Sequence, residues 1–388
     1  MTLGAYIQVP FCQTKCTYCN FHTGVVSRDR YAPYAEAVCC EIALWKEPGG
    51  DLRGPDIDTV YFGGGTPSLL DPAALAKILA GLRPCFSSPA EVETTLEADP
   101  ETITAEKAQA WLEAGFNRIS LGSQSFADRE LRAAGRMHRR ADIYAAAKLL
   151  GEVGFRNISM DLIAGLPHQT RESWEESVRE LLKIRPEHAS IYMLEIDEGS
   201  RLGRESLAGG SGYSAARIPS DDAIAECYEF ACARLAGEGY EHYEISNWAL
   251  PGRWSRHNLK YWRREPYIGF GAGAHSFDGH TRWANIHDWA RYVSCIEQGI
   301  STREQIESVT SEQALEEEFF LGLRQLEGVD LERIERAYAP DLRGQLDLLR
   351  ERISGLRSQG LVELAGARLR LAPDRLTVSN EVFTELLG

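Results

Sequence analysis

The spacing of three cysteines near the start of the chain constrains this sequence more than any other feature. Cys12, Cys16 and Cys19 form a C-x3-C-x2-C motif directly after an apolar run, Ala5–Phe11, that predicts a β-strand. Three thiolates this close together can bind one soft metal centre. A zinc site usually has a fourth Cys or His ligand, for which His22 is the nearby candidate, whereas three cysteines on a 4Fe–4S cluster leave one iron free for a substrate or cofactor. The motif therefore favours an iron–sulfur cluster, with zinc and purely structural thiols as the weaker alternatives.

The first half of the chain alternates short β-rich runs with helical patterns. The predicted strands are Ala5–Phe11, Thr59–Phe62, Val92–Glu97, Arg118–Gly122, Asn157–Ile163 and Ala189–Ile196. The predicted helices between them are Tyr31–Lys46, Pro72–Leu82, Ala105–Ala114, Ala141–Val153 and Arg171–Ile184. Such alternation predicts an α/β fold with a parallel sheet. We favour a partial (β/α)6 barrel over a flat doubly wound sheet, because apolar strands covered by helices on their outer face can curl.

The second half of the chain changes in character twice. Residues 201–220 are rich in Gly and Ser and predict a loop, after which Asp221–Glu238 predicts a helix capped by Ser220. Beyond Thr310 a Leu-, Glu- and Arg-rich helical pattern leads into LVEL-AGA-RLRL (361–371), which predicts a β-hairpin. Helices followed by such a wing predict a smaller C-terminal winged-helix-like α+β domain. The predicted division is a barrel over 1–200, a barrel-capping region over 201–305 and the C-terminal domain over 306–388.

Charge and apolar content narrow the classes of function. With 42 Lys and Arg against 57 Asp and Glu, the net charge is −15, which argues against non-specific binding to nucleic acid. No run approaches the ~20 apolar residues of a membrane span, and the amino terminus lacks the pattern of a signal peptide. Nine cysteines, an odd number, in a long chain without a secretory signal do not indicate a disulfide framework. We therefore expect a cytoplasmic protein, with peripheral contact to a membrane left open.

Further motifs follow the cysteines in a fixed order. They are GGGTP (63–67), LEADP (96–100), RISLGSQSF (118–126), GRMH (135–138), MDLIAGLP (160–167) and YIGFGAGAHS (267–276). Together with the cysteine motif they resemble the oxygen-independent coproporphyrinogen III oxidase family of the radical S-adenosylmethionine (radical SAM) superfamily. The resemblance implies a radical SAM partial barrel with a 4Fe–4S cluster on Cys12, Cys16 and Cys19. It also implies that S-adenosylmethionine contacts Tyr6, Tyr18, Gly64, Gly65, Thr66, Glu97, Gln124, Arg136 and Asp161.

Departures from the oxidase pattern favour one branch of this family. Phe21 stands where the oxidase has a fourth cysteine, Gln8 stands where it has a histidine, and only five residues precede Tyr6. The segment His257–Trp262 reads His-Asn-x-x-Tyr-Trp, a motif of the HemW branch, whose members are regarded as haem chaperones. Two functions are open at this stage: a HemW-like carrier that binds haem and passes it to an acceptor protein, and an oxidase that decarboxylates coproporphyrinogen III. The differences from the oxidase pattern favour the haem carrier. They leave open whether the protein is also an enzyme.

The His-Asn-x-x-Tyr-Trp segment also suggests a haem ligand. On a helix, Tyr261 shares a face with His257, so the imidazole can bind iron while the phenol ring packs on the macrocycle. Lys260 and the pair Arg263-Arg264 then lie close enough to meet the haem propionates. The alternative is that Tyr261 and its neighbouring Trp are core aromatics. The partners expected are haem, an unidentified haem acceptor, an electron donor such as flavodoxin or ferredoxin, and no nucleic acid, with a monomer and a homodimer both open.

Overall fold

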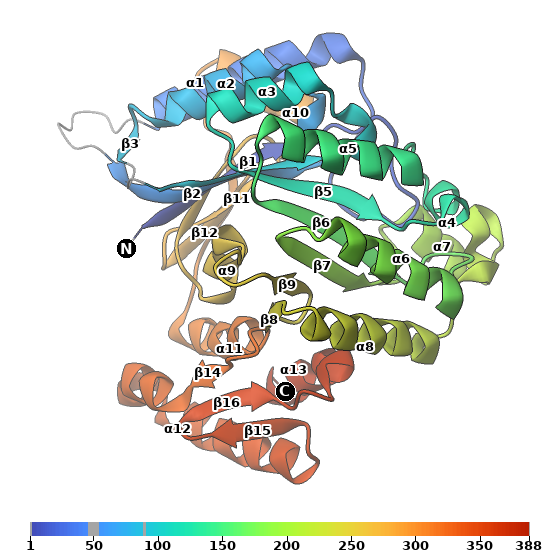
Figure 1. Ribbon diagram of the computed structural model, residues 1–388. Coiled ribbons are helices and arrows are strands. Elements are labelled where there is room, and N and C mark those ends of the chain that lie inside the picture. Colours follow the sequence, from blue (N-terminus) through green and yellow to red (C-terminus); the bar gives the residue numbers. More distant parts are fainter. Residues whose placement is uncertain (1, 46–53, 88–90, 388) are drawn as a thin grey trace.

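A curved, open sheet of parallel strands forms the centre of the molecule in the computed structural model, which describes residues 2–45, 54–87 and 91–387. Its parallel strands are β1 (Leu3–Val9), β2 (Gly54–Gly64), β4 (Glu93–Ala98), β5 (Arg118–Gln124), β6 (Ile158–Ala164) and β7 (His188–Met193). Helices cover the outer face of this sheet (Figure 1), and they are α1 (Tyr31–Leu44), α2 (Pro72–Leu82), α3 (Ala105–Ala114), α5 (Arg140–Val153) and α6 (Arg171–Ile184). The predicted partial (β/α)6 barrel is confirmed; the end of the first predicted helix, at Lys46, lies outside the described residues.

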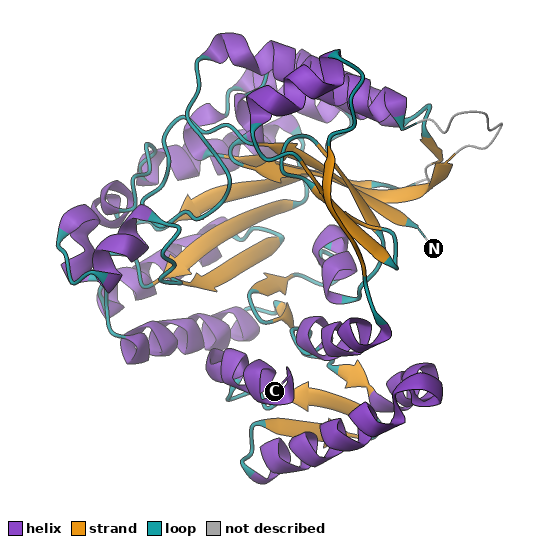
Figure 2. Ribbon diagram, turned by 180° about the vertical axis from the view of Figure 1, so that it is seen from behind, coloured by secondary structure: helices purple, strands orange, loops and turns teal. Residues whose placement is uncertain are grey.

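Further strands, most of them antiparallel to their neighbours, lengthen the sheet at both edges. β9 (Asn247–Ala249) and β8 (Glu241–Glu244) extend it beyond β7. β10 pairs in parallel with β1, and the strands that continue from there are β10 (Tyr267–Phe270), β11 (His275–Phe277), β12 (Thr281–Asn285) and β13 (Arg303–Ser308). The strand order β13-β12-β11-β10-β1-β2-β4-β5-β6-β7-β9-β8 makes no pairing between its two ends in the described chain, so the barrel stays open; the short β3 (Phe86–Ser87) pairs with β2. Figure 2 shows the resulting curvature from behind.

Alternation along β1 separates the core from the barrel interior. Ala5, Ile7 and Val9 are fully buried in the core under the helices. The intervening Tyr6 and Gln8 point to the opposite face, because successive side chains of a strand alternate. The helices bury an apolar layer against one face of the sheet, and the concave face is left for polar side chains.

The segment Arg201–Ser220 differs from the predicted loop. It contains a helix, α7 (Arg201–Leu207), whose N-cap Ser200 accepts a hydrogen bond from the Gly203 amide at 2.8 Å. The Leu202 amide donates to the Thr17 carbonyl at 2.8 Å, and the Leu202 side chain is buried. The helix therefore depends on a tertiary contact with the cysteine loop, which a local composition rich in Gly and Ser does not reveal.

Further helices in this part of the chain are α4 (Asp128–Ala133), α8 (Asp221–Gly237) and α10 (Trp289–Glu297). As predicted, Ser220 caps α8 by accepting from the Ala223 amide at 3.4 Å. The helix α9 (Arg256–Trp262) packs against the interior of the barrel at the amino ends of β1 and β2.

The C-terminal domain, coloured orange to red in Figure 1, lies beside the barrel. Its elements are α11 (Ser311–Gly322), β14 (Val329–Asp330), α12 (Leu331–Ser358), β15 (Val362–Ala365), β16 (Arg368–Leu371) and α13 (Ser379–Leu387). β15 and β16 form the predicted hairpin, and β14 pairs with β16 to complete a three-stranded sheet. The expected small α+β domain with a two-stranded wing is present. Within the described ranges, no helix combines the length and the apolar character needed to cross a membrane.

Candidate functional site

A cavity of about 490 Å³ opens at the carboxyl ends of the parallel strands. It brings together residues from the cysteine loop and from the ends of β2, β4, β5 and β6, the edge at which barrel folds carry their chemistry. Most of the residues that the sequence assigned to a cluster or to S-adenosylmethionine line it. They are Cys12, Cys16, Tyr18, Cys19, Gly64, Gly65, Thr66, Glu97, Gln124, Arg136 and Asp161.

The cysteine loop is held in place by backbone contacts on several sides. The Thr17 amide donates to the Ala134 carbonyl at 2.9 Å, and the Thr14 hydroxyl donates to the Gly135 carbonyl at 3.1 Å. Arg201 of α7 donates to the carbonyl of Lys15. All three cysteines are free thiols at the cavity wall, although in the described chain no three Cys, His, Asp or Glu side chains converge at metal-binding geometry. The loop thus gathers the three thiols around one cavity. Their arrangement around a metal centre would be completed when that centre binds.

The GGGTP segment joins the cysteine loop by strand-like pairing. The Gly65 amide donates to the Val9 carbonyl at 2.8 Å, and the Thr66 amide donates to the Phe11 carbonyl at 2.7 Å. A Cβ atom at Gly65 would lie only 2.5 Å from the Phe11 oxygen, and Gly64 has a φ of +112°. Glycine is therefore required at both positions, first for the close approach and then for the left-handed turn.

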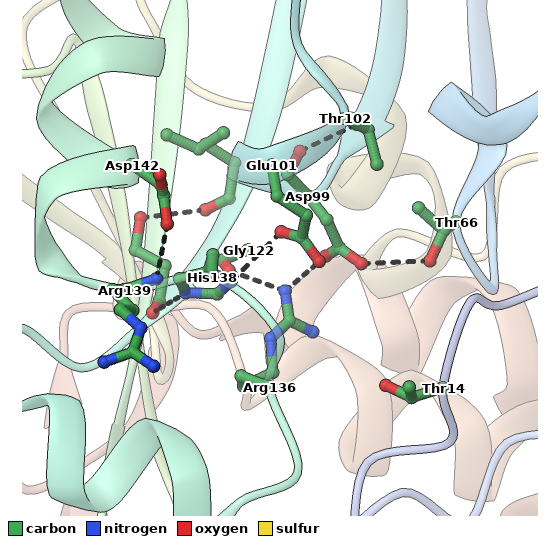
Figure 3. Close-up of polar contacts among 12 residues, drawn as sticks. Thr14, Thr66, Asp99, Glu101, Thr102, Gly122, Arg136, His138, Arg139 and Asp142 are labelled. Carbon is green, nitrogen blue, oxygen red and sulfur yellow. Dashed lines mark hydrogen bonds and ion pairs between the residues drawn. The ribbon is translucent and has the colours of Figure 1, made fainter.

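An ion pair between Arg136 and Asp99 forms one wall of the cavity (Figure 3). The Arg136 guanidinium also donates to the Gly122 carbonyl at 2.8 Å and to Cys16 Sγ at 3.5 Å. Asp99 in turn accepts from the Thr66 hydroxyl at 3.1 Å. The LEADP motif does not by itself single out Asp99, because the importance of this residue comes from contacts with Thr66 and Arg136 on other loops. Arg136, which the family resemblance assigns to S-adenosylmethionine, pairs in this structure with the carboxylate of Asp99.

Two carboxyl groups lie deeper in the cavity at the ends of β4 and β6. Glu97 accepts from the Tyr61 hydroxyl at 2.8 Å and from the Gly64 amide at 3.1 Å. Burial, together with repulsion from Asp161, raises the pKa of Glu97 to about 7, and burial raises the pKa of Asp161 to about 6. Asp161 Oδ1 is buried with no hydrogen-bond partner among the described residues. The floor of the cavity therefore offers unfilled acceptor capacity to a ligand with hydroxyl or ammonium donors.

Tyr6 lies behind the cavity wall. Its hydroxyl donates to Gln8 Oε1 at 2.8 Å, and its ring stacks on Tyr61 with centroids 6.0 Å apart. A Cβ atom at Gly63 would lie 3.0 Å from the Tyr6 hydroxyl, so the Tyr6 side chain packs against the start of the GGGTP segment. Tyr6 therefore positions the Tyr61 ring, and Tyr61 in turn is hydrogen-bonded to Glu97.

His257 lies away from the cavity, on α9 inside the barrel. Its Nδ1 is 2.8 Å from the Thr59 hydroxyl and its Nε2 is 2.9 Å from the Tyr261 hydroxyl, and the residue is 1% exposed. Burial lowers the pKa of this imidazole to about 3. Both ring nitrogens are engaged, so the structure places His257 in a buried hydrogen-bond chain and leaves it no free nitrogen for haem iron.

The cations expected to meet haem propionates are also occupied. Lys260 pairs with Asp58 at 2.9 Å and with Glu265 at 3.1 Å, and Arg264 pairs with Glu317 at 2.7 Å. Lys260 and Arg264 therefore already have anionic partners within the protein, whereas the exposed Arg263 donates to Gln325 Oε1 at 3.1 Å. Two of the three cations expected beside His257 are thus held in internal ion pairs.

Comparison with known proteins agrees with the geometry of the cavity. The radical SAM superfamily model matches residues 6–181, and the model of the HemN C-terminal domain matches residues 309–374. The chain is 35% identical over 387 residues to "Heme chaperone HemW" of Bacillus subtilis (strain 168), covering 99% of both chains. It belongs to the HemW family of the radical SAM superfamily. It is also 36% identical over 280 residues to the HemW protein of Escherichia coli (strain K12), covering 70% of this chain and 69% of that one.

A solved structure supports the same fold. The coproporphyrinogen III oxidase HemN of Escherichia coli, described as a radical SAM enzyme, superposes with a TM-score of 0.83 and 22% identity, covering 99% of this chain and 90% of that one. At this identity the likeness shows the shared fold. The identity with HemW proteins over nearly the whole chain favours the chaperone family over the oxidase.

The cavity fits the cofactors that its superfamily uses. Three thiols on one loop suit a 4Fe–4S cluster with an open iron, and the unpaired Asp161 oxygen suits a ligand that carries hydroxyl or ammonium groups. Sequence reasoning identified these residues through motif order. It did not identify Asp99 or Tyr61, which act on the predicted residues from neighbouring strands.

Proposed function

We propose that this protein is a cytoplasmic haem chaperone that binds haem and passes it to an acceptor protein. The observation that carries the proposal is the identity with HemW proteins over 99% of the chain. The cavity adds chemical support, because it places three cysteines beside the residues that the family resemblance assigns to S-adenosylmethionine. The proposed partners are haem, a haem-acceptor protein and an electron donor such as flavodoxin or ferredoxin.

The residues of the cavity divide the work of holding the two cofactors. Cys12, Cys16 and Cys19 would hold the cluster, and Glu97 and Asp161 would accept hydrogen bonds from the hydroxyl or ammonium groups of S-adenosylmethionine. When bound, the cluster and S-adenosylmethionine supply one-electron chemistry.

The walls of the cavity keep these residues in register. The Arg136–Asp99 pair fixes the wall between Cys16 and Thr66, and the backbone anchors of the cysteine loop fix the spacing of the thiols. In this proposal the cluster serves haem binding and release, and the oxidase reaction is absent.

The test follows haem from this protein to an acceptor. Anaerobically purified protein with its cluster and S-adenosylmethionine is loaded with hemin and mixed with apomyoglobin, and the Soret band reports transfer. We expect transfer from this protein to be faster than from hemin-loaded albumin at the same concentration. The same preparation, given reductant and coproporphyrinogen III, should form no protoporphyrinogen IX. Decarboxylation without haem binding would overturn the chaperone proposal in favour of the oxidase.

A further inference from the structure

Three histidines gather beside the cysteine loop without belonging to the cavity described above. The ring centroids of His22 and His287 are 4.4 Å apart, and those of His275 and His287 are 6.2 Å apart. His22 comes from the loop after Cys19, His275 begins β11 and His287 follows β12. They lie far apart in the sequence and meet only because β10 pairs with β1. We call them the histidine cluster.

The histidine cluster contains ring nitrogens that the fold does not use. His138, His188, His242 and His257 each make a ring hydrogen bond to a protein oxygen, at distances from 2.7 to 3.1 Å. In the described chain, the ring nitrogens of the three clustered residues make no hydrogen bond. His287 Nδ1 is in addition buried with no partner there. A buried, unpaired imidazole nitrogen costs stability unless a ligand binds it.

The backbone around the histidine cluster is fixed. The Gly24 amide donates to the Pro10 carbonyl at 2.9 Å, and the Cys12 amide donates to the Gly24 carbonyl at 3.0 Å, so the segment that carries His22 is tied to the end of β1. The Gly273 amide donates to the Ile286 carbonyl at 3.0 Å. A Cβ atom at Gly273 would lie 2.9 Å from His287 Nδ1, so glycine there allows the loop to approach the imidazole.

The surroundings suit a flat apolar ligand with anionic groups. Phe21 and Val25, on either side of His22, are 65% and 60% exposed. Burial and the neighbouring His287 lower the pKa of His22 and of His275, which keeps these imidazoles neutral and able to ligate a metal at neutral pH. The Lys15 ammonium donates to the Phe21 carbonyl at 3.2 Å at an exposed position. Residues 15–25 thus carry two exposed apolar side chains, a cation and an imidazole with a lowered pKa, and this imidazole lies beside His287.

We propose that the histidine cluster is the haem site, where an imidazole of the cluster ligates the haem iron, Phe21 and Val25 contact the macrocycle and Lys15 meets a propionate. This rests on the proposed haem-chaperone function and deepens it by placing the ligand. Because Phe21 also lines the cavity that holds Cys12, Cys16 and Cys19, haem at the histidine cluster lies directly beside the cysteine loop. The arrangement gives a physical route by which the cluster affects haem binding.

The test compares hemin binding by full-length, cluster-loaded variants. We expect the triple variant His22→Ala/His275→Ala/His287→Ala to bind hemin at least tenfold more weakly, with a shifted Soret band that free imidazole partly restores. His280→Ala, an exposed histidine outside the histidine cluster, is the matched control and should behave as wild type. Iron content and circular dichroism establish that each variant is folded, and the single His→Gln variants replace the triple variant if it does not fold.

Each result bears on a different statement. Wild-type protein that binds no hemin contradicts the proposed function itself. Wild-type binding that the triple variant keeps, with an unchanged spectrum, overturns the haem site, as does loss of binding on His257→Gln while the histidine cluster is intact. Loss of bound Zn²⁺ in the triple variant with unchanged hemin affinity also overturns it and assigns these residues to a divalent metal.

Discussion

Glu97 makes the stability of this protein depend on pH in a direction that can be tested. Its ordinary pKa of 4.5 describes the unfolded chain, and in the folded protein burial raises that pKa to about 7. The folded protein therefore keeps a proton that the unfolded chain has already lost in the window between these values. The stabilisation by protonated Glu97 is complete below about pH 4.5 and is lost as the pH rises through about 7. The difference between these two pKa values means that ionisation of Glu97 lowers the free energy of unfolding by at most about 3 kcal/mol.

Replacing Glu97 with Gln removes the charge and keeps the size of the side chain and an acceptor for the Tyr61 hydroxyl. Because the carboxyl is only partly shielded from water in the cavity, we expect the variant to exceed wild type by about 1–2 kcal/mol in free energy of unfolding at pH 8. Near pH 5 this difference in free energy of unfolding should shrink to less than about 1 kcal/mol. Urea unfolding without S-adenosylmethionine, followed by circular dichroism at both pH values, measures it. Glu152→Gln, at a glutamate 66% exposed on α5, is the control and should show no such pH dependence.

The same substitution should weaken binding of S-adenosylmethionine, since an amide cannot replace both carboxylate oxygens as acceptors. Stability and cofactor binding then move in opposite directions, as is common where a site holds a buried charge. A Glu97→Gln protein less stable than wild type at pH 8, or one with an equal gain at pH 5 and pH 8, would refute the reasoning.

Three further predictions follow from the site and its supports. Cys16→Ala should abolish a content of about four irons per chain in anaerobically reconstituted protein, whereas the exposed Cys40→Ala should retain it; stoichiometric zinc without iron would contradict this. Asp99→Asn should weaken S-adenosylmethionine binding by about tenfold in calorimetry, because Arg136 loses its partner; unchanged affinity would assign the pair to stability alone. His257→Gln should lower the free energy of unfolding by roughly 1–3 kcal/mol without changing the iron content, and an unchanged free energy would show that its hydrogen bonds are dispensable.

Local signals explain which elements were predictable from the sequence. Helices α2, α3 and α6 begin and end where predicted. Each follows an N-cap residue whose side chain accepts a hydrogen bond from a backbone amide of the first turn, and these N-caps are Asp71, Thr104 and Thr170. The helix α7 was missed because its stabilising contact, Leu202 to Thr17, joins distant parts of the chain. Patterns within a short stretch of sequence do not report such a long-range contact.

The candidate site divides in the same way. The cysteines and GGGTP are contiguous motifs, so sequence alone could nominate them. The Arg136–Asp99 pair and the histidine cluster depend on which strand lies beside which, and that information appears only with the fold. His257 was misplaced for a related reason, because helical spacing correctly put Tyr261 on its face but could not show that Thr59 occupies the other nitrogen.

The His-Asn-x-x-Tyr-Trp motif gains a structural meaning from these contacts. At one end His257 is hydrogen-bonded to Thr59 of β2, under the strand that leads to the GGGTP turn. At the other end the Arg324 guanidinium lies 4.4 Å from the centroid of the Trp262 ring, and Gln325 donates to the Trp262 carbonyl at 3.4 Å. Arg324 belongs to the C-terminal domain and also lines the cluster cavity. Because packed interiors transmit small displacements, the motif links the barrel, the C-terminal domain and the cavity wall, and this role requires no contact between His257 and haem.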